Sequence, residues 1–227
     1  VKENITYLLN SLKSIVNETE TNKKILHIFN TKYLLDKKKF DNLPLGLFGD
    51  FYSQELSFFL INKNDYKNLE SIFSKCNLKI NKIISKNFID GANLVNKNNY
   101  ETFLKVEINI FDSKIIFFEN SSLKFVQDFD FGSELVLLDI SKIIGLKVET
   151  IKEILINEDY KEEDSKDALL EKKYFGENNY RKVKKNLIYE IAIARIKEFS
   201  EVLIKNNKDI SSMTSKKIPV FLKINDK

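Results

Sequence analysis

The residues 105–152 read KVEINIFDSKIIFFENSSLKFVQDFDFGSELVLLDISKIIGLKVETIK, and this stretch determines the fold. Apolar and polar residues alternate where it begins, which is typical of a β-strand. The apolar set is Leu104, Val106, Ile108 and Ile110, and the polar set is Lys105, Glu107 and Asn109. Ile115–Phe118 and Leu123–Phe131 form two more strands, with a hairpin turn at Asn120–Ser122. We therefore expect a three-stranded antiparallel sheet over Leu104 to Phe131.

Helical spacing replaces the alternation after this sheet. Gly132 marks the change, and helices follow over Leu135–Ile144 and Val148–Ile156 with Gly145 between them. Apolar residues from Ile188 to Leu203 indicate a long helix. A final strand is expected at Ile218–Ile224. The sequence thus predicts a sheet with helices packed on it.

The residues before this sheet predict a smaller α+β module behind an amphipathic helix that opens the chain. Its expected strands are Lys24–Phe29, Tyr33–Leu35, Leu56–Ile61 and Leu78–Ser85, and Asp41–Asp50 is expected to be a loop because it contains Pro44, Gly46 and Gly49. One helix lies before the last strand. Its expected inner face is Leu69, Ile72, Phe73 and Cys76, and Asn77 is expected to end it in a left-handed conformation.

Composition restricts the function classes. The 227 residues carry a net charge of only +4, which argues against nucleic acid as a partner. The single cysteine cannot form an internal disulfide. No apolar run approaches the roughly 20 residues that a membrane-spanning helix needs, and the first residues do not resemble a signal peptide.

Few residues suggest chemistry on their own. His27 is the only histidine, so a catalytic triad or a histidine-rich metal site is not expected and a structural role is favoured. The acidic residues between Glu158 and Asp167 lack the spacing of a calcium loop and are interpreted as a solvated segment. The basic group Lys182, Lys184 and Lys185 is interpreted as a solvated face. Neither GxxxxGK[ST] nor GxGxxG occurs.

Taken in order, several motifs resemble the bacterial cell-division protein family FtsA, membrane-tethered relatives of actin. Ile25 to Asp36 resembles I-L-H-x-x-P-x-x-Y-x-x-D, with Asn30 in place of proline, and Pro44 to Gly49 matches P-x-G-x-x-G. Asn68 to Ile80 resembles part of the family's inserted subdomain. The same likeness continues through Leu123 to Ser141, Val148 to Lys152 and Ile191 to Val202. It covers essentially the whole chain.

The resemblance implies an α/β fold of the actin-like (ribonuclease H-like) ATPase type, expected to be incomplete, with an inserted small α+β subdomain. A remnant of the first lobe would occupy 1–22, the inserted, protein-binding subdomain 23–85, a return to the first lobe 86–102, and the second lobe 103–227. The family's first phosphate loop would precede this chain. Its adenosine-side glycines and membrane-targeting helix would lie at or after the end of this chain, so we expect no membrane anchor here.

The resemblance also implies ATP with magnesium as the cofactor, but the phosphate loop of the second lobe has lost its glycines. Asn109, Ile110 and Phe111 stand where glycines would let backbone N–H groups approach a phosphate. We therefore expect much weakened ATP binding without hydrolysis. The residues carried over as remnants of the nucleotide cleft are Glu107, Asn109, Asp112, Ser113, Gly132, Glu149 and Lys152. No catalytic residue and no metal ligand is expected.

The implied function is that of a cell-division scaffold at the inner face of the cell membrane, which links FtsZ filaments to that membrane and recruits later division proteins. Self-association is also expected, through an exposed sheet edge and an apolar cleft. Two alternatives stay open. One is an active ATPase of the actin or Hsp70 type, and the other is a different actin-fold adaptor, for pilus assembly or cell shape.

Overall fold

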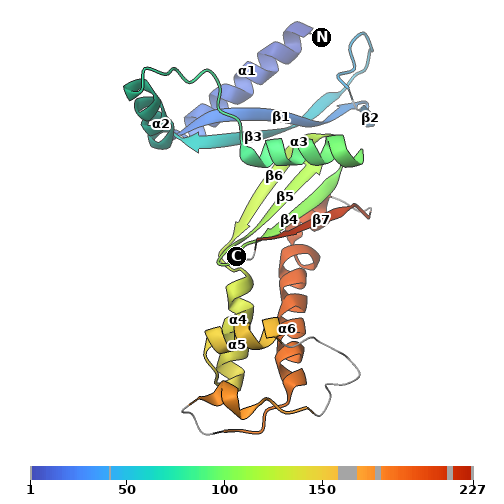
Figure 1. The fold of residues 1–227 in the computed structure, drawn as a ribbon. Helices are drawn as coiled ribbons and strands as arrows, with labels where there is room; N and C mark the ends of the chain where they lie inside the picture. Colours follow the sequence, from blue (N-terminus) through green and yellow to red (C-terminus); the bar gives the residue numbers. More distant parts are fainter. Residues whose placement is uncertain (1, 41, 158–167, 177–179, 214–216, 226–227) are drawn as a thin grey trace. The chain divides into compact units, whose positions relative to one another are not determined.

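The structure is a computed structural model, and it describes residues 2–40, 42–157, 168–176, 180–213 and 217–225 (Figure 1). The chain divides into two compact units. The first contains residues 1–105 and 116–126, and the second contains 106–115 and 127–227. The division passes through the strands β4 (Phe103–Ile108), β5 (Ser113–Glu119) and β6 (Ser122–Phe129). The subdomain boundaries proposed from the sequence stay predictions.

The first unit is built on a three-stranded sheet of order β2-β1-β3, with β1 (Lys23–Leu35) antiparallel to β2 (Lys38–Phe40) and to β3 (Tyr52–Asn62). The sequence predicted two short strands where β1 runs unbroken for 13 residues. The polar residues in its middle, Asn30 to Lys32, looked like an interruption. The strand absorbs them with a shift of register between Asn30 and Lys32.

Two further predictions for this unit were wrong. Leu78–Ser85 is not a strand. The helix α2 (Lys63–Lys75) has no buried residue, and most of its expected inner face is exposed: Leu69 is half-buried, but Ile72 is 59% exposed and Cys76 is also in solvent. The expected end of this helix is confirmed, because Asn77 adopts a φ of 57°. The opening helix α1 (Lys2–Thr19) is present as expected.

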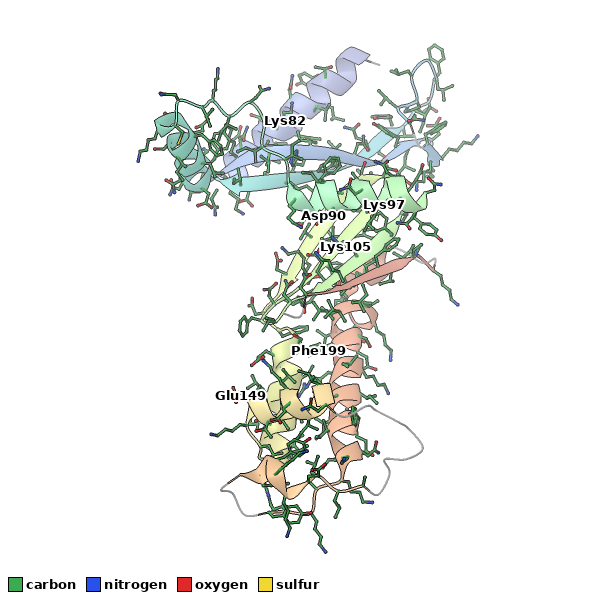
Figure 2. The ribbon with its side chains drawn as sticks, viewed as in Figure 1. Lys82, Asp90, Lys97, Lys105, Glu149 and Phe199 are labelled. Carbon is green, nitrogen blue, oxygen red and sulfur yellow. The ribbon has the colours of Figure 1, made fainter. Side chains whose placement is uncertain are left out.

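The helix α3 (Lys86–Asn98) packs against β4 and β5 within the first unit. Gly91 of α3 lies so close to Phe118 of β5 that a Cβ atom would be 1.9 Å from the phenyl ring. This cover also buries Lys105, which the alternating pattern had placed on a polar face. The Lys105 ammonium lies 3.3 Å from the Asp90 carboxylate of α3, and Figure 2 marks both residues.

The second sheet has four strands in the order β6-β5-β4-β7. The meander predicted from the sequence supplies β4, β5 and β6, and the expected last strand is β7 (Val220–Ile224). The hairpin turn is also confirmed. Asn120 and Ser121 have φ of 50° and 59°, as a two-residue turn with both φ values positive requires.

Helices complete the second unit: α4 (Ser133–Ile144), α5 (Val148–Asn157), the 3₁₀ turn η1 (Lys172–Phe175), α6 (Lys185–Ser200), the π turn η2 (Glu201–Lys205) and α7 (Lys208–Met213). Their main cluster of buried side chains comes from α4, α5, η1 and α6. It contains Ile140, Ile144, Leu146, Ile151, Ile154, Leu170, Tyr174, Phe175 and Ile188. Gly145 lies between α4 and α5 as expected, and it ends α4 with a φ of 72°. The acidic residues Glu158 to Asp167 lie outside the described residues.

His27 has a structural environment in β1. Its ring lies beside those of Phe29 and Phe88, with centroids 5.5 and 6.2 Å away, and its Nε2 accepts a hydrogen bond of 3.0 Å from the Ser85 N–H. Burial, reinforced by the Lys82 ammonium, lowers the pKa of His27 from its ordinary value of 6.5. An Nε2 that accepts a hydrogen bond must be unprotonated, so the folded state favours the neutral ring.

We expect the free energy of unfolding to fall as the pH is lowered through about 6.5. Below this pH the unfolded chain binds a proton at His27, whereas the folded chain resists protonation until the pH reaches its lower folded-state pKa. Thermal unfolding followed between about pH 7.5 and 5 measures the effect. Because His27 is the only histidine, His27→Gln should remove most of this slope. An unchanged slope in the variant would contradict the assignment.

Candidate functional site

The loop from Asn109 to Asp112, between β4 and β5, occupies the place of the expected phosphate loop, and Asn109 closes it. The Asn109 N–H donates to the Asp112 carbonyl oxygen at 2.8 Å, and its Nδ2 donates to the Asp112 carboxylate at 2.6 Å. Its Oδ1 accepts from Nδ2 of Asn225, which follows β7, at 2.7 Å. The side chain that replaces a glycine therefore ties both ends of the loop together and links them to the end of β7.

The first turn of α4 is joined to this loop through backbone hydrogen bonds. The N–H groups of Ser133 and Glu134 donate to the carbonyl oxygens of Asn109 and Ile110, each at 2.9 Å. N–H groups at a helix N-terminus can bind an anion when nothing else occupies them. Here the loop itself takes them. Gly132 permits this approach, because a Cβ atom at that position would lie 2.2 Å from the Asn109 carbonyl oxygen.

The remaining predicted residues of this region have separate environments. Ser113 is fully buried, and its hydroxyl donates to the Phe131 carbonyl oxygen at 2.7 Å. Glu107 is half-buried on β4, and Asp112 is exposed. Phe111 is also exposed. The structure thus brings Asn109, Asp112, Ser113 and Gly132 to one junction of loop and helix, where the exposed side chains of the loop are acidic or apolar.

Glu149 and Lys152 lie on the outer side of α5, where both are exposed (Figure 2 labels Glu149). The Lys152 ammonium lies 3.4 Å from the Glu134 carboxylate in the first turn of α4. Lys152 is therefore connected to the loop–helix junction through Glu134. The residue pattern did not indicate Glu134 as the partner of Lys152.

This junction does not fit the phosphates of ATP. A phosphate needs converging N–H donors or cationic side chains. The N–H groups of Asn109, Ser133 and Glu134 already donate to carbonyl oxygens of the protein. Asp112 adds a negative charge. For magnesium, no group of three or more His, Cys, Asp or Glu side chains suited to a metal occurs among the described residues.

The first unit contains a cluster of ion pairs around Lys124 that has a structural role. Lys124 of β6, with a nearly buried side chain, contacts the carboxylates of Glu119 and Glu55, the latter at 2.9 Å. Burial alone would lower the pKa of Lys124, but the hydrogen bonds to both carboxylates outweigh it and raise this pKa. The charge is thus satisfied within the protein and is not available for chemistry.

The second unit contains an apolar hollow of about 460 Å³ between helices and sheet. It is lined from β4, α4, α5, α6, η2 and β7 by Val106, Ile108, Ser133, Val136, Leu137, Ile140, Leu155, Ala192, Ile196, Phe199, Ser200, Leu203, Ile204, Val220, Leu222 and Ile224. Among these lining residues, two serine hydroxyls are the only polar side-chain groups. Such a surface suits apolar side chains and not a nucleotide.

The strand β7 lies at the edge of the four described strands. Its residues Val220, Leu222 and Ile224 line the hollow and are 49–61% exposed. The exposed sheet edge and the apolar cleft expected from the sequence are therefore present in the described part of the second unit. The self-association inferred from them stays a prediction. No helix in the described residues is long and apolar enough to span a membrane.

No protein-family model matches the sequence, and no curated protein matches it. Solved structures do. A chain of the PilM–PilN type IV pilus biogenesis complex is 8% identical with a TM-score of 0.52, and the match covers 96% of this chain and 55% of that one. EutJ, the ethanolamine utilization protein of Carboxydothermus hydrogenoformans, is 11% identical over 68% of this chain and 46% of its own, with a TM-score of 0.41. MreB5 of Spiroplasma citri bound to AMPPNP is 14% identical over 71% and 54%, with a TM-score of 0.44.

The chain therefore has the α/β fold of the actin-like ATPases, as the sequence predicted. It spans about 55% of the length of the pilus-complex chain that it matches. At this identity the likeness establishes the fold alone. The function has to be argued from the residues of this chain.

Proposed function

We propose that this protein is an actin-fold scaffold that acts through protein contacts and does not turn over ATP. The observation that carries the proposal is the closed loop from Asn109 to Asp112. An actin-fold protein that hydrolyses ATP needs backbone donors free to bind phosphate. In this chain the loop carbonyls occupy the donors of Ser133 and Glu134. The chain keeps the fold, but its own loop carbonyl oxygens occupy N–H groups that a phosphate would need.

The first unit supplies a surface suited to a protein partner. Its helix α2 exposes Ile72 and Phe73, at 59% and 42%, and Leu78 beyond the helix is exposed as well. Exposed apolar groups that gather on one element mark interaction sites more often than chance would place them. The residues that the sequence assigned to a small core thus become the proposed contact surface.

The finer proposal is a scaffold of the FtsA type, which would link filaments of FtsZ to the inner face of the cell membrane at the division site and recruit later division proteins. The order and spacing of the motifs from Ile25 to Val202 support it. In this proposal, α2 contributes to the contact with a division protein.

Cosedimentation with FtsZ filaments from the same organism tests the division role. We expect the chain to pellet with filaments and Ile72→Ser to weaken binding roughly tenfold, the loss estimated for one buried aliphatic side chain. Ile156→Ser is the matched control, because Ile156 is 81% exposed on α5 in the second unit. A chain that stays in the supernatant would exclude FtsZ as the direct partner. Equal losses in both variants would exclude α2 as the contact.

Calorimetric titration with ATP and magnesium tests the loss of nucleotide function. We expect no binding in the micromolar range and no phosphate release, because the N–H groups of Asn109, Ser133 and Glu134 already donate to carbonyl oxygens of the protein. MreB5 of Spiroplasma citri, whose structures contain AMPPNP and ADP, is a suitable positive control. Micromolar affinity for this chain would overturn the proposal.

A pilus-assembly adaptor is the second candidate, favoured by the match to the PilM–PilN complex over 96% of the chain. It shares the same mode of action, which is protein binding by an actin fold. The two candidates differ in partner, so a pull-down with FtsZ and with a PilN-type protein from the same organism separates them. Retention of the PilN-type protein alone would favour the pilus role.

A further inference from the structure

The connection between β2 and β3 carries a concentration of exposed apolar side chains. Phe48 is 99% exposed and Phe51 is 80% exposed, and Leu45 and Leu47 are exposed on the same loop. Figure 1 shows this connection extending away from the strands of the first unit. A Cβ atom at Gly46 would meet nothing within 4 Å, whereas one at Gly49 would lie 2.6 Å from the Leu35 side chain, so the loop is free at Gly46 and packed against β1 at Gly49. We name residues 45–51 the apolar tip.

The apolar tip is held in place at both ends. Pro44 is buried and Leu43 is half-buried on one side. On the other side, the Asp36 carboxylate accepts hydrogen bonds from the N–H groups of Asp50 and Phe51, at 3.0 and 2.8 Å. The Asp36 N–H in turn donates to the Phe51 carbonyl oxygen at 2.8 Å. An anchored loop that keeps two phenyl rings in water has a cost in solvation, which a ligand for the rings would relieve.

Charges of both signs lie beside the apolar tip, because Asp50 of the loop is exposed. Lys37 in the β1–β2 turn and Lys38 at the start of β2 are both exposed, and they directly follow Asp36, the residue that holds the loop base. The Asp36 carboxylate is turned toward backbone N–H groups of the loop. Leucine and phenylalanine side chains beside lysines are the composition that binds to the interface of an anionic bilayer.

We propose that the apolar tip inserts into the surface of a bilayer that contains anionic lipids, with Lys37 and Lys38 at the headgroups. A single projecting loop needs no complementary pocket in a bilayer, whereas a protein partner would have to supply one for Phe48 and Phe51. The contact is independent of any division or pilus partner. It assigns a lipid ligand to the first unit of this chain.

Tryptophan fluorescence of the full chain tests the insertion. The chain has no tryptophan, so Phe48→Trp gives a single reporter at the apolar tip. We expect its emission to shift to the blue on addition of phosphatidylcholine vesicles containing phosphatidylglycerol, and brominated lipids to quench it. Ile156→Trp, at an exposed position of α5, is the matched control and should show neither change. No shift for Phe48→Trp, or an equal shift for both variants, would overturn the proposal.

Vesicle flotation with the tryptophan-free chain gives a second, independent measurement. We expect Phe48→Ser to lower the vesicle partition coefficient about tenfold, as the loss of one buried phenyl group predicts, with an unchanged circular dichroism spectrum because this side chain is solvent-exposed. Replacing Lys37 and Lys38 by Gln should lower the partition coefficient for anionic vesicles by roughly fivefold per lysine and leave neutral vesicles unaffected. If the tip responds only to an added protein and never to vesicles, it is a protein contact and the bilayer assignment is wrong.

Discussion

Replacing Gly91 by alanine should lower the free energy of unfolding by roughly 2–4 kcal/mol, the upper range for overpacking of a core. The new Cβ atom would lie 1.9 and 2.0 Å from two ring carbons of Phe118. That ring is fully buried and stacks on Phe103 at a centroid distance of 5.0 Å, so it has nowhere to move. Alanine favours a helix over glycine by about 1 kcal/mol, which offsets only part of the strain.

Urea unfolding of the variants measures this effect and its cause. Phe118→Leu in the Gly91→Ala background should recover part of the loss, because it removes the ring carbons that clash, so the two changes should not be additive. Gly46→Ala is the control: its Cβ atom meets nothing within 4 Å, and its φ of +78° should cost only about 1 kcal/mol. Additive changes, or a Gly91→Ala variant more stable than the wild type, would contradict the predicted contact.

Periodicity in the sequence located most elements because it reports which side of a segment is apolar. The strands of the meander and the helices α4, α5 and α6 were found in this way. The left-handed Asn77 was predicted from its residue type at the end of a helix. Predicting these elements requires no knowledge of contacts between residues distant in the sequence.

Periodicity does not show what covers an apolar face, and the errors follow from this. The helix α2 has an apolar side, but the expected strand at Leu78–Ser85 is absent and Ile72 stays in water. Lys105 shows the opposite error, because the approach of α3 buries a residue that the pattern had placed in solvent. Both outcomes depend on tertiary contacts between segments.

Some features of the candidate site could be predicted from the sequence, and others depend on tertiary contacts. Missing glycines are visible in a sequence, so the pattern of residues was enough to single out Asn109 and Gly132. The bond from Asn225 to Asn109 joins residues 116 positions apart, and no local pattern contains it. The use of the α4 donors by loop carbonyls is a property of the backbone, which residue identities alone do not specify.

Replacing Gly132 by valine should lower the free energy of unfolding by roughly 3 kcal/mol or more, and the effect should be centred on the candidate site. The added Cβ atom would lie 2.2 Å from the Asn109 carbonyl oxygen and 2.5 Å from that of Ile110. Both are backbone atoms, so the loop has to move away from α4. That movement breaks the hydrogen bonds from Ser133 and Glu134, each worth about 1 kcal/mol.

Hydrogen exchange distinguishes this local opening from a general loss of stability. In Gly132→Val, the amides of Ser133 and Glu134 should exchange much faster. The exchange rates of amides in α6 should rise only as far as the lower free energy of unfolding predicts. Ser133→Ala is the control, because it keeps the backbone N–H and should leave both bonds intact. Unchanged protection at 133 and 134 in the valine variant would contradict the predicted clash with the loop. Rapid exchange of these two amides in the unmodified chain would show that the loop is not closed on the helix. The donors would then be open to an anion, and the case against nucleotide binding in this chain would lose its main physical support.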